Sequence, residues 1–276
     1  MKQSFQVFLK ILSLLVVFAA HEIESSFEII PISSRQEGMG GVSGGPGSRG
    51  ALWLHPASTA DLQGNWLTSS YSQLWGLREL TLSSFVYTHP LGAARVSAGI
   101  SDFGCTHYRE NIGCFSIAAR FRASLDLGIN AKWMRRAIGE EDIENVISID
   151  GGLMVSPLDE FTVEVASHNI GSPAIGVDRL DQDLLAGFTY RPSDGLLISL
   201  NLLKQRGYPL QLCVGQEFRL TPWFTQRAGA KQNPTAITLG FGITPPYVEL
   251  DYAATLHPLL GTTHSFSLSA TGFWSE

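Results

Sequence analysis

The sequence predicts an all-β protein: an antiparallel transmembrane β-barrel of about fourteen strands, preceded by an export signal. Three observations lead to this prediction. Charged residues make up only 16% of the chain and the mean hydropathy is +0.09, whereas about a quarter of the residues in a soluble domain are charged. Beyond the N-terminus, no apolar run approaches the roughly 20 residues that a spanning helix needs. From residue 65 onward, apolar and polar residues alternate, which is typical of strands.

Residues 1–20 have the features of a secretory signal peptide. Two lysines flank the short apolar stretch 11–20, which ends in small residues, and cleavage is expected after residue 19 or 20. An uncleaved anchor is the alternative, although about ten apolar residues are too few to span a bilayer. Removing these residues changes the net charge from −6 to −8 because both charged groups are lysines. A nucleic-acid partner is therefore not expected, since it would require a basic face.

Residues 65–276 are predicted to form the barrel because their alternation has a period of two. In one run the apolar face holds Leu125, Leu127, Ile129, Ala131 and Trp133, and the opposite face holds Asp126, Gly128, Asn130, Lys132 and Met134. A helix would instead repeat near every fourth residue. Turn-forming residues such as His89-Pro90 separate the runs, which indicates hairpins between antiparallel neighbours. An even number of strands places both ends of the barrel on one side of the membrane.

The connections and the aromatic residues favour a membrane barrel over a secreted β-sandwich. Longer polar connections are expected at residues 104–111, 137–145 and 171–183, alternating with short turns. Aromatic residues recur near the predicted strand ends and suit two interfacial girdles; they are Trp66, Trp75, Tyr87, Trp133, Tyr190, Trp223, Tyr247 and Trp274. The polar faces are rich in Gly, Ser and Thr, whereas a water-facing sheet of a sandwich would carry Lys and Glu.

Three cysteines are present, and two of them lie close together in the sequence. Cys105 and Cys114 flank a polar stretch, so in an oxidising compartment they are candidates for a disulfide across a hairpin. Two semi-buried free thiols are the alternative. Cys213 is unpaired in either case. The spacing matches no zinc pattern, and we expect neither a metal nor a cofactor.

The sequence offers no assignable catalytic site. His107, His168, His257 and His264 lie at scattered strand ends without an identifiable serine partner. The glycine-rich residues 38–47 are followed by no Gly-Lys-Ser/Thr end and by no parallel βαβ pattern, so they do not indicate a nucleotide-binding loop. We therefore expect that the protein is not an enzyme.

The segment before the barrel carries a family resemblance. Arg35, the run Gly38-Met39-Gly40-Gly41, and Leu52-Trp53-Leu54-His55-Pro56-Ala57 resemble the opening of the PorV and PorQ family of outer-membrane barrels, which are similar to the fatty-acid transporter FadL. His55 stands where that family has an asparagine, although an imidazole also accepts a hydrogen bond. Shorter matches at residues 169–171, 190–196, 240–243, 250–253 and 261–268 extend the resemblance over the mature chain.

The resemblance implies that residues 21–64 fold inside the lumen as a plug with a short helix near Pro56. Its expected plug residues are Arg35, Gly38, Gly40, Gly41, His55 and Pro56. A barrel of about fourteen strands is too wide for its own side chains to fill, which agrees with this expectation. A disordered N-terminus is the alternative.

Charged residues on the predicted inner face are candidates for lining the lumen. They are Arg120, Arg122, Asp126, Lys132, Asp150, Glu217, Arg219, Glu249 and Asp251. Charges that face an enclosed lumen are usually paired. We therefore expect most of them to form ion pairs, and the others to line a path.

Two functions are consistent with the resemblance. The similarity to FadL implies a channel or transporter for small hydrophobic molecules. The similarity to PorV and PorQ implies instead a non-enzymatic component of a protein-secretion or surface-attachment apparatus of the type IX kind. In both cases we expect the outer membrane of a Gram-negative-type bacterium, contact with its lipid, and recognition of the last strand by the barrel-assembly machinery. That strand ends with Phe273 and Trp274 before two polar residues.

Overall fold

Fourteen strands close into one antiparallel barrel, as the alternation predicts. The structure is a computed structural model that describes residues 27, 32–121, 124–139, 142–206 and 208–272. The signal peptide, the predicted lumen residue Arg122, and Phe273 with Trp274 lie outside these residues. Within the described part of the chain, no helix is long and apolar enough to cross a membrane.

The strands follow one another around the barrel in chain order. They are β1 (Trp66–Gln73), β2 (Thr81–Leu91), β3 (Ala94–Gly104), β4 (Tyr108–Phe121), β5 (Leu125–Ile138), β6 (Asp142–Leu158), β7 (Phe161–His168), β10 (Asp183–Ser193), β11 (Leu196–Lys204), β12 (Gln211–Thr221), β13 (Phe224–Gln232), β14 (Ala236–Ile243), β15 (Val248–His257) and β16 (Gly261–Thr271). The short strands β8 (Ala174–Ile175) and β9 (Asp178–Arg179) form a separate hairpin between β7 and β10. The described residues also contain four short helices: α2 (Ser34–Gly38), η1 (Ala51–Trp53), η2 (Pro56–Thr59) and η3 (Leu74–Gly76).

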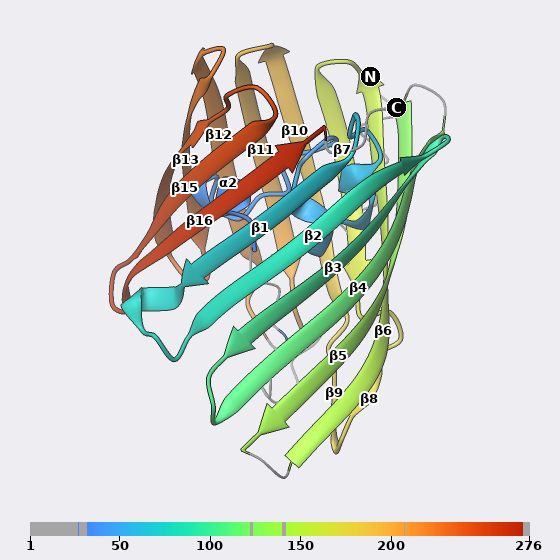
Figure 1. The fold of residues 1–276 in the computed structure, drawn as a ribbon, viewed down its shortest axis with the longest axis vertical. Coiled ribbons are helices and arrows are strands. Elements are labelled where there is room, and N and C mark those ends of the chain that lie inside the picture. Colours follow the sequence, from blue (N-terminus) through green and yellow to red (C-terminus); the bar gives the residue numbers. More distant parts are fainter. Residues whose placement is uncertain (1–26, 28–31, 122–123, 140–141, 207, 273–276) are drawn as a thin grey trace.

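Pairing of β1 with β16 closes the barrel, with Trp66 opposite Thr271. The barrel wall therefore begins and ends at one rim, near the top of Figure 1, which we call the terminal end. The opposite rim, where β8 and β9 lie, is the distal end. This placement agrees with the even strand count expected from the sequence.

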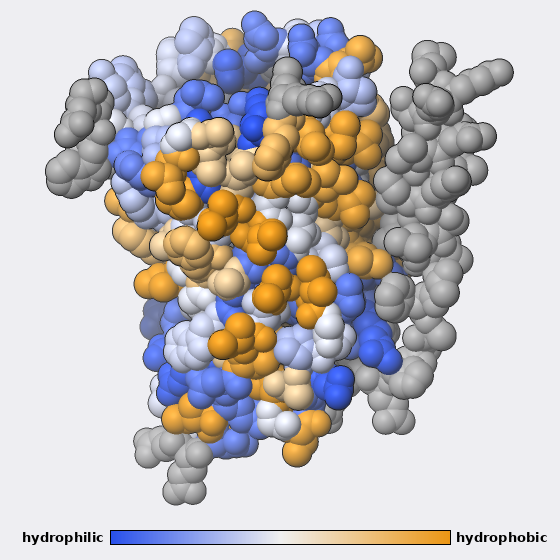
Figure 2. Space-filling model, turned by 90° about the vertical axis from the view of Figure 1, so that its right-hand side faces the viewer, coloured by the Kyte–Doolittle hydropathy of each residue, from blue (hydrophilic) through white to orange (hydrophobic). Residues whose placement is uncertain are grey.

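The barrel wall is apolar outside and polar inside, in the alternation that the sequence predicts. On β5, Ile129 is 62% exposed and Trp133 is 48% exposed, whereas the inward Asn130 is fully buried. Figure 2 shows apolar side chains spread over the side of the barrel that lies at the right in Figure 1. Tyr190, Trp223 and Tyr247 are exposed near the terminal end. So much exposed apolar surface requires an apolar environment, since soluble monomers rarely expose large apolar patches.

Two of the three predicted long connections are wrong. β4 already begins at Tyr108, and β5 and β6 extend to Ile138 and Asp142, so the hairpins at residues 104–111 and 137–145 are tight. Their polar residues belong to strands that continue past the apolar part of the wall, and polarity alone does not distinguish such strands from loops. The third connection is long as predicted: β7 and β10 are joined by residues 169–182, which contain β8 and β9.

The candidate disulfide between Cys105 and Cys114 is also wrong, because all three cysteines are free. Cys114 lies opposite Gly99 in the β3–β4 hairpin, whereas Cys105 follows the last residue of β3. Six residues of extended chain span about 20 Å at roughly 3.4 Å each. A disulfide requires Cα atoms within about 7 Å, so the register of this hairpin prevents the bond.

We predict that Ile129→Arg destabilises the folded barrel in lipid vesicles by about 2–4 kcal/mol if the residue lies near the bilayer midplane. The reason is that residue 129 points outward, where a guanidinium would face hydrocarbon. Ile129→Leu is the control and should change the unfolding free energy by less than about 1.5 kcal/mol. Denaturant unfolding from vesicles measures both. Equal stabilities of the two variants would mean that β5 does not face lipid in this register.

Candidate functional site

The described N-terminal segment, residues 32–62, lies inside the barrel. In Figure 1 its blue ribbon lies inside the ring of strands, toward the terminal end. Several of its apolar side chains are completely buried, among them Met39, Val42, Leu52 and Ala57. The short helix expected near Pro56 is present as η2. The segment therefore forms the inner boundary of any space that remains in the lumen.

A pair of glycines on the wall accommodates the backbone of residues 38–40. Gly215 on β12 and Gly229 on β13 lie directly opposite each other. A Cβ on Gly215 would lie 2.1 Å from the carbonyl oxygen of Met39, and one on Gly229 would lie 2.4 Å from the backbone nitrogen of Gly40. Because any side chain at either position would collide with backbone, this contact requires glycine.

A second glycine pair accommodates residues 55–57. Gly128 on β5 lies opposite Gly152 on β6. A Cβ on Gly128 would lie 2.3 Å from the carbonyl carbon of Pro56, and one on Gly152 would lie 2.8 Å from Cε1 of His55. The segment therefore contacts the wall at two distant places, each through a directly paired glycine couple.

His55 acts as the N-cap of η2. Its Nδ1 accepts a hydrogen bond from the backbone N–H of Ala57 at 3.2 Å, and its Nε2 lies 3.1 Å from the carbonyl oxygen of Val165. These partners require the neutral tautomer that carries the proton on Nε2. The side chain is completely buried. Burial, assisted by nearby His168, lowers the pKa of His55 to about 3, so the ring is neutral at physiological pH.

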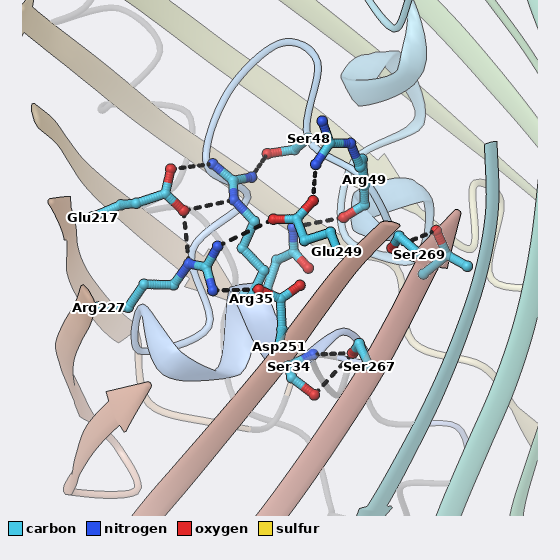
Figure 3. A network of polar contacts seen from close by, with 12 residues as sticks. Ser34, Arg35, Ser48, Arg49, Glu217, Arg227, Glu249, Asp251, Ser267 and Ser269 are labelled. Carbon is cyan, nitrogen blue, oxygen red and sulfur yellow. Dashed lines mark hydrogen bonds and ion pairs between the residues drawn. The ribbon is translucent and has the colours of Figure 1, made fainter. Parts of the chain in front are cut away.

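Arg35 joins the segment to the wall through a buried carboxylate. It donates two hydrogen bonds to Glu217 on β12, at 2.8 and 3.1 Å, and one to Ser48 at 2.5 Å. Burial alone would lower the pKa of Arg35, but the facing Glu217 carboxylate raises it above its ordinary value. Arg227 on β13 donates to the same carboxylate at 2.7 Å. Figure 3 shows the two guanidinium groups on either side of Glu217.

The same network extends to β15 and returns to the segment. Arg227 also contacts Asp251 at 2.5 Å and Glu249 at 3.4 Å, and Glu249 binds Arg49 of the segment. Three arginines thus face three carboxylates, so the buried charges balance. Two of these arginines, Arg35 and Arg49, belong to the N-terminal segment, so the network attaches this segment to three strands.

The remaining predicted lumen residues that the structure describes form two further ion-pair clusters, except for Arg219. Lys132 contacts Asp150 at 2.9 Å, and His168 contacts the same carboxylate at 3.3 Å. Arg120 binds Asp126 on β5 at 2.7 Å and Asp61 of the segment at 2.5 Å. These charges are paired, not free to line a path. Arg219 lies on the same face of β12 as Glu217, opposite the buried Thr225, and is exposed near the terminal end of the strand.

One sequence pattern needs a structural interpretation. Residues 41–45 read Gly-Val-Ser-Gly-Gly, which formally matches the Gly-x-Ser-x-Gly pattern of hydrolase nucleophiles. The Ser43 hydroxyl, however, donates to Glu164 at 2.5 Å, and the backbone N–H of Ser43 donates to Asn201 at 3.0 Å. No described histidine contacts this hydroxyl. Ser43 therefore anchors the segment to the wall. The described residues also contain no cluster of three or more potential metal ligands.

Between the segment and the distal end, the lumen contains a cavity of about 450 Å³. Its inner boundary includes Glu37, Gly40, Gly41 and Leu54 of the segment. Its wall exposes more apolar than polar surface: Leu74, Trp75, Phe103, Leu185, Leu203 and Tyr208 are among the apolar and aromatic lining residues, and Asn201, Gln205 and Lys231 are among the polar ones. The lining carboxylates have partners: Glu37 accepts from Thr255, and Glu110 accepts from the backbone N–H of Phe27 at 3.0 Å. Such a lining suits a small hydrophobic molecule better than an ion.

Sequence reasoning missed these cavity residues. Leu185 and Leu203 point inward, but their outward neighbours Leu184 and Leu202 are equally apolar. Where both faces of a strand are apolar, alternation does not indicate which one faces the lumen.

Solved structures share this fold. A FadL homologue of Pseudomonas aeruginosa superimposes with a TM-score of 0.65 at 14% identity, covering 90% of this chain and 99% of that chain. The monoaromatic hydrocarbon channel CymD gives 0.69 at 12% identity, covering 91% and 100%. The toluene transporter TodX of Pseudomonas putida gives 0.65 at 11% identity, covering 90% and 98%. The chain therefore has a FadL-like barrel fold. No family model and no curated protein matches the sequence.

We predict that Gly152→Ala loosens the N-terminal segment, because the added Cβ would lie within 3.0 Å of His55 and Pro56. The expected cost is about 1–3 kcal/mol, as for other overpacked sites, together with faster tryptic cleavage after Arg49. Gly151→Ala is a matched control on the adjacent outward position, where the nearest atom lies at 3.5 Å, and should leave both readouts unchanged. Equal cleavage rates in the two variants would contradict the close contact.

We predict that His55 makes the protein acid-sensitive. Its folded pKa of about 3 lies below the ordinary value of 6.5, so the unfolded chain binds a proton first as pH falls, and stability is lost from about pH 6.5 downward. Between pH 7 and pH 5 the loss is about 2 kcal/mol. His55→Asn retains a hydrogen-bond acceptor for the cap but does not titrate, so denaturant unfolding of this variant should lack that part of the loss. Parallel pH profiles for both proteins would be the contrary result.

Proposed function

We propose that the protein is an outer-membrane channel or transporter for small hydrophobic molecules. The observation that carries this proposal is the cavity in the lumen, whose wall exposes more apolar than polar surface. A general porin would be expected to have an open, polar lumen instead. Here most of the lumen charges expected from the sequence form ion pairs, and the space that remains is lined in part by residues such as Leu185 and Leu203.

The outer membrane is the environment that best fits the surface. The strands close into a barrel, as a membrane-spanning sheet requires. Its outward side chains are apolar, and the expected signal peptide directs export. A closed barrel with this surface is typical of outer-membrane proteins.

The N-terminal segment is proposed to act as the plug of this barrel. Its placement is supported by two glycine pairs and by the arginine network. The plug residues proposed from sequence have separate roles: Arg35 binds Glu217, Gly38 and Gly40 contact wall backbone, and His55 caps the helix that starts at Pro56. These residues are those that carry the resemblance to the PorV and PorQ family, so we propose that type for this chain.

Uncharged aromatic molecules are the substrate class that we favour. Two of the similar structures are described as a monoaromatic hydrocarbon channel and a toluene transporter. The cavity here carries aromatic side chains, and its carboxylates Glu37 and Glu110 already have partners. An additional charge on a substrate would therefore lack a counter-charge and lose hydration on entry.

The uncharged aromatic dye 1-N-phenylnaphthylamine tests this function, because its fluorescence rises in apolar surroundings. Cells of a Gram-negative host that express the protein should accumulate the dye faster than vector controls. Leu203→Asp places a charge in the cavity wall and should lower the gain roughly tenfold, which corresponds to about 1.4 kcal/mol. Leu203→Met is the matched control and should retain the uptake.

Heat-modifiable migration on gels establishes that each variant has folded as a barrel. Uptake equal to the vector control by the folded unmodified protein would rule out passage of this class of molecule. Equal uptake by Leu203→Asp and Leu203→Met would place the path outside the described cavity.

A further inference from the structure

Strand β6 is longer than the neighbour that should cover it. Its residues 142–155 pair with β5 without interruption, but its pairing with β7 begins only at Gly151. β7 ends at His168, and the chain then enters the connection that contains β8 and β9. The distal part of β6, residues 142–150, therefore has a strand on one side only.

The direction of the hydrogen-bonding groups identifies the open ones. The carbonyl oxygen of Ile149 points to the β7 side, where it accepts from the backbone N–H of Ile170 at 2.9 Å. In antiparallel strands, the N–H and C=O of one residue point to the same side, and successive residues alternate. The backbone groups of Ile143, Asn145 and Ile147 therefore also point to the β7 side. Within the described residues, these groups have no hydrogen-bond partner.

The lumen-facing side of this part of β6 is packed against other residues of the barrel. Inside the barrel, Val146 packs with Met134 of β5 and with Ile175 and Leu180 of the 169–182 connection. Arg136 also binds Glu144 at 2.5 Å and Asp178 at 2.8 Å. The connection thus supports the inner face of β6 and leaves its edge open. The edge is consequently a fixed strand, not a frayed end.

The edge lies where the outer surface changes from apolar to polar. Four outward polar residues form a direct row across β3 to β6: Asp102, Asn111, Arg135 and Asn145. Asn111 donates to Asp102 at 2.5 Å, and Arg135 donates to Asn111 at 3.3 Å. On the terminal side of this row the wall is apolar, and Ile147 is 71% exposed. The open edge therefore extends from the distal end, past the polar row at Asn145, to the start of the apolar wall at Ile147.

We propose that residues 143–149 of β6 form a docking edge, at the distal end of the barrel, for an extended segment of another protein. Only an extended backbone presents donors and acceptors at the spacing of a strand edge, which is the basis of β-strand addition. Natural edges are commonly protected by lysine, proline or a bulge, and none of the residues from 143 to 149 is lysine or proline. The edge accommodates at most about seven residues of partner.

A second copy of this chain does not fit the edge. Antiparallel pairing of two β6 edges would place one barrel upside down in the membrane. Parallel pairing would turn one strand over, so that its inward Val146 and Ser148 would lie on the same face as the lipid-facing Ile147 of the other copy. The partner is therefore a different chain, with apolar residues on the side that continues the Ile143 and Ile147 face. This inference does not depend on the transport proposal.

Hydrogen exchange on the full-length mature protein in detergent tests the free edge. The amides of Asn145 and Ile147 should exchange as exposed amides, whereas those of Glu144, Val146 and Ser148, which face β5, should be protected. Protection of all five amides in the free protein would overturn the proposal, since the edge would then already be occupied.

A fluorescent seven-residue peptide of alternating threonine and valine, blocked at both ends, probes docking. It should bind the unmodified protein and protect the amides of Asn145 and Ile147. Ile147→Pro removes one donor from the open side only, where proline is tolerated, and should weaken binding about tenfold. Ile147→Thr keeps the N–H and should bind within about twofold of the unmodified protein.

Heat-modifiable migration confirms that both variants fold. A peptide N-methylated at alternate residues cannot complete the ladder and should not bind. Absence of binding by the unmodified protein, or equal binding by Ile147→Pro and Ile147→Thr, would overturn the proposal. Dye uptake is measured separately, so failure of the transport proposal leaves this result interpretable.

Discussion

Backbone-to-backbone contact between the N-terminal segment and the barrel wall is the constraint on which the rest of the lumen depends. At Gly215 and Gly229, and again at Gly128 and Gly152, a single Cβ would collide with the segment. These two contacts fix the position of the segment along the barrel axis. This axial position in turn sets the inner boundary of the cavity and determines which charged residues of the wall the segment's arginines can contact.

The electrostatics of the lumen follow from that placement. A charge inside the barrel is costly unless it is paired, and Arg35 and Arg49 of the segment lie opposite the carboxylates Glu217 and Glu249 of the wall. Arg227 completes the charge balance by contacting both carboxylates. Because neither the segment nor the wall is neutral in this region alone, removing one of them would leave the other with buried unpaired charge. Charge balance and close packing thus favour the same position.

The wall itself has two distinct regions. Around most of its circumference each strand has two neighbours, and the outward apolar residues suit lipid. At the distal part of β6 one neighbour is missing, and the outer surface there becomes polar at Asn145. A cavity inside and a free strand edge outside are separate features, which would allow one protein to pass small molecules and also contact a protein partner.

The sequence by itself determined the local features of the fold. Period-two alternation is a property of each strand, so it predicted the barrel, its strand number and the inward direction of residues such as Asp126 and Glu217. The residues before the barrel also indicated a short helix near Pro56. Only the tertiary structure decided which residues meet across strands. The register pairs Gly128 with Gly152 and Gly215 with Gly229 and separates Cys105 from Cys114. It also leaves the distal part of β6 paired with β5 alone. These features depend on the alignment of residues far apart in the chain, and alternation alone carries no information about that alignment.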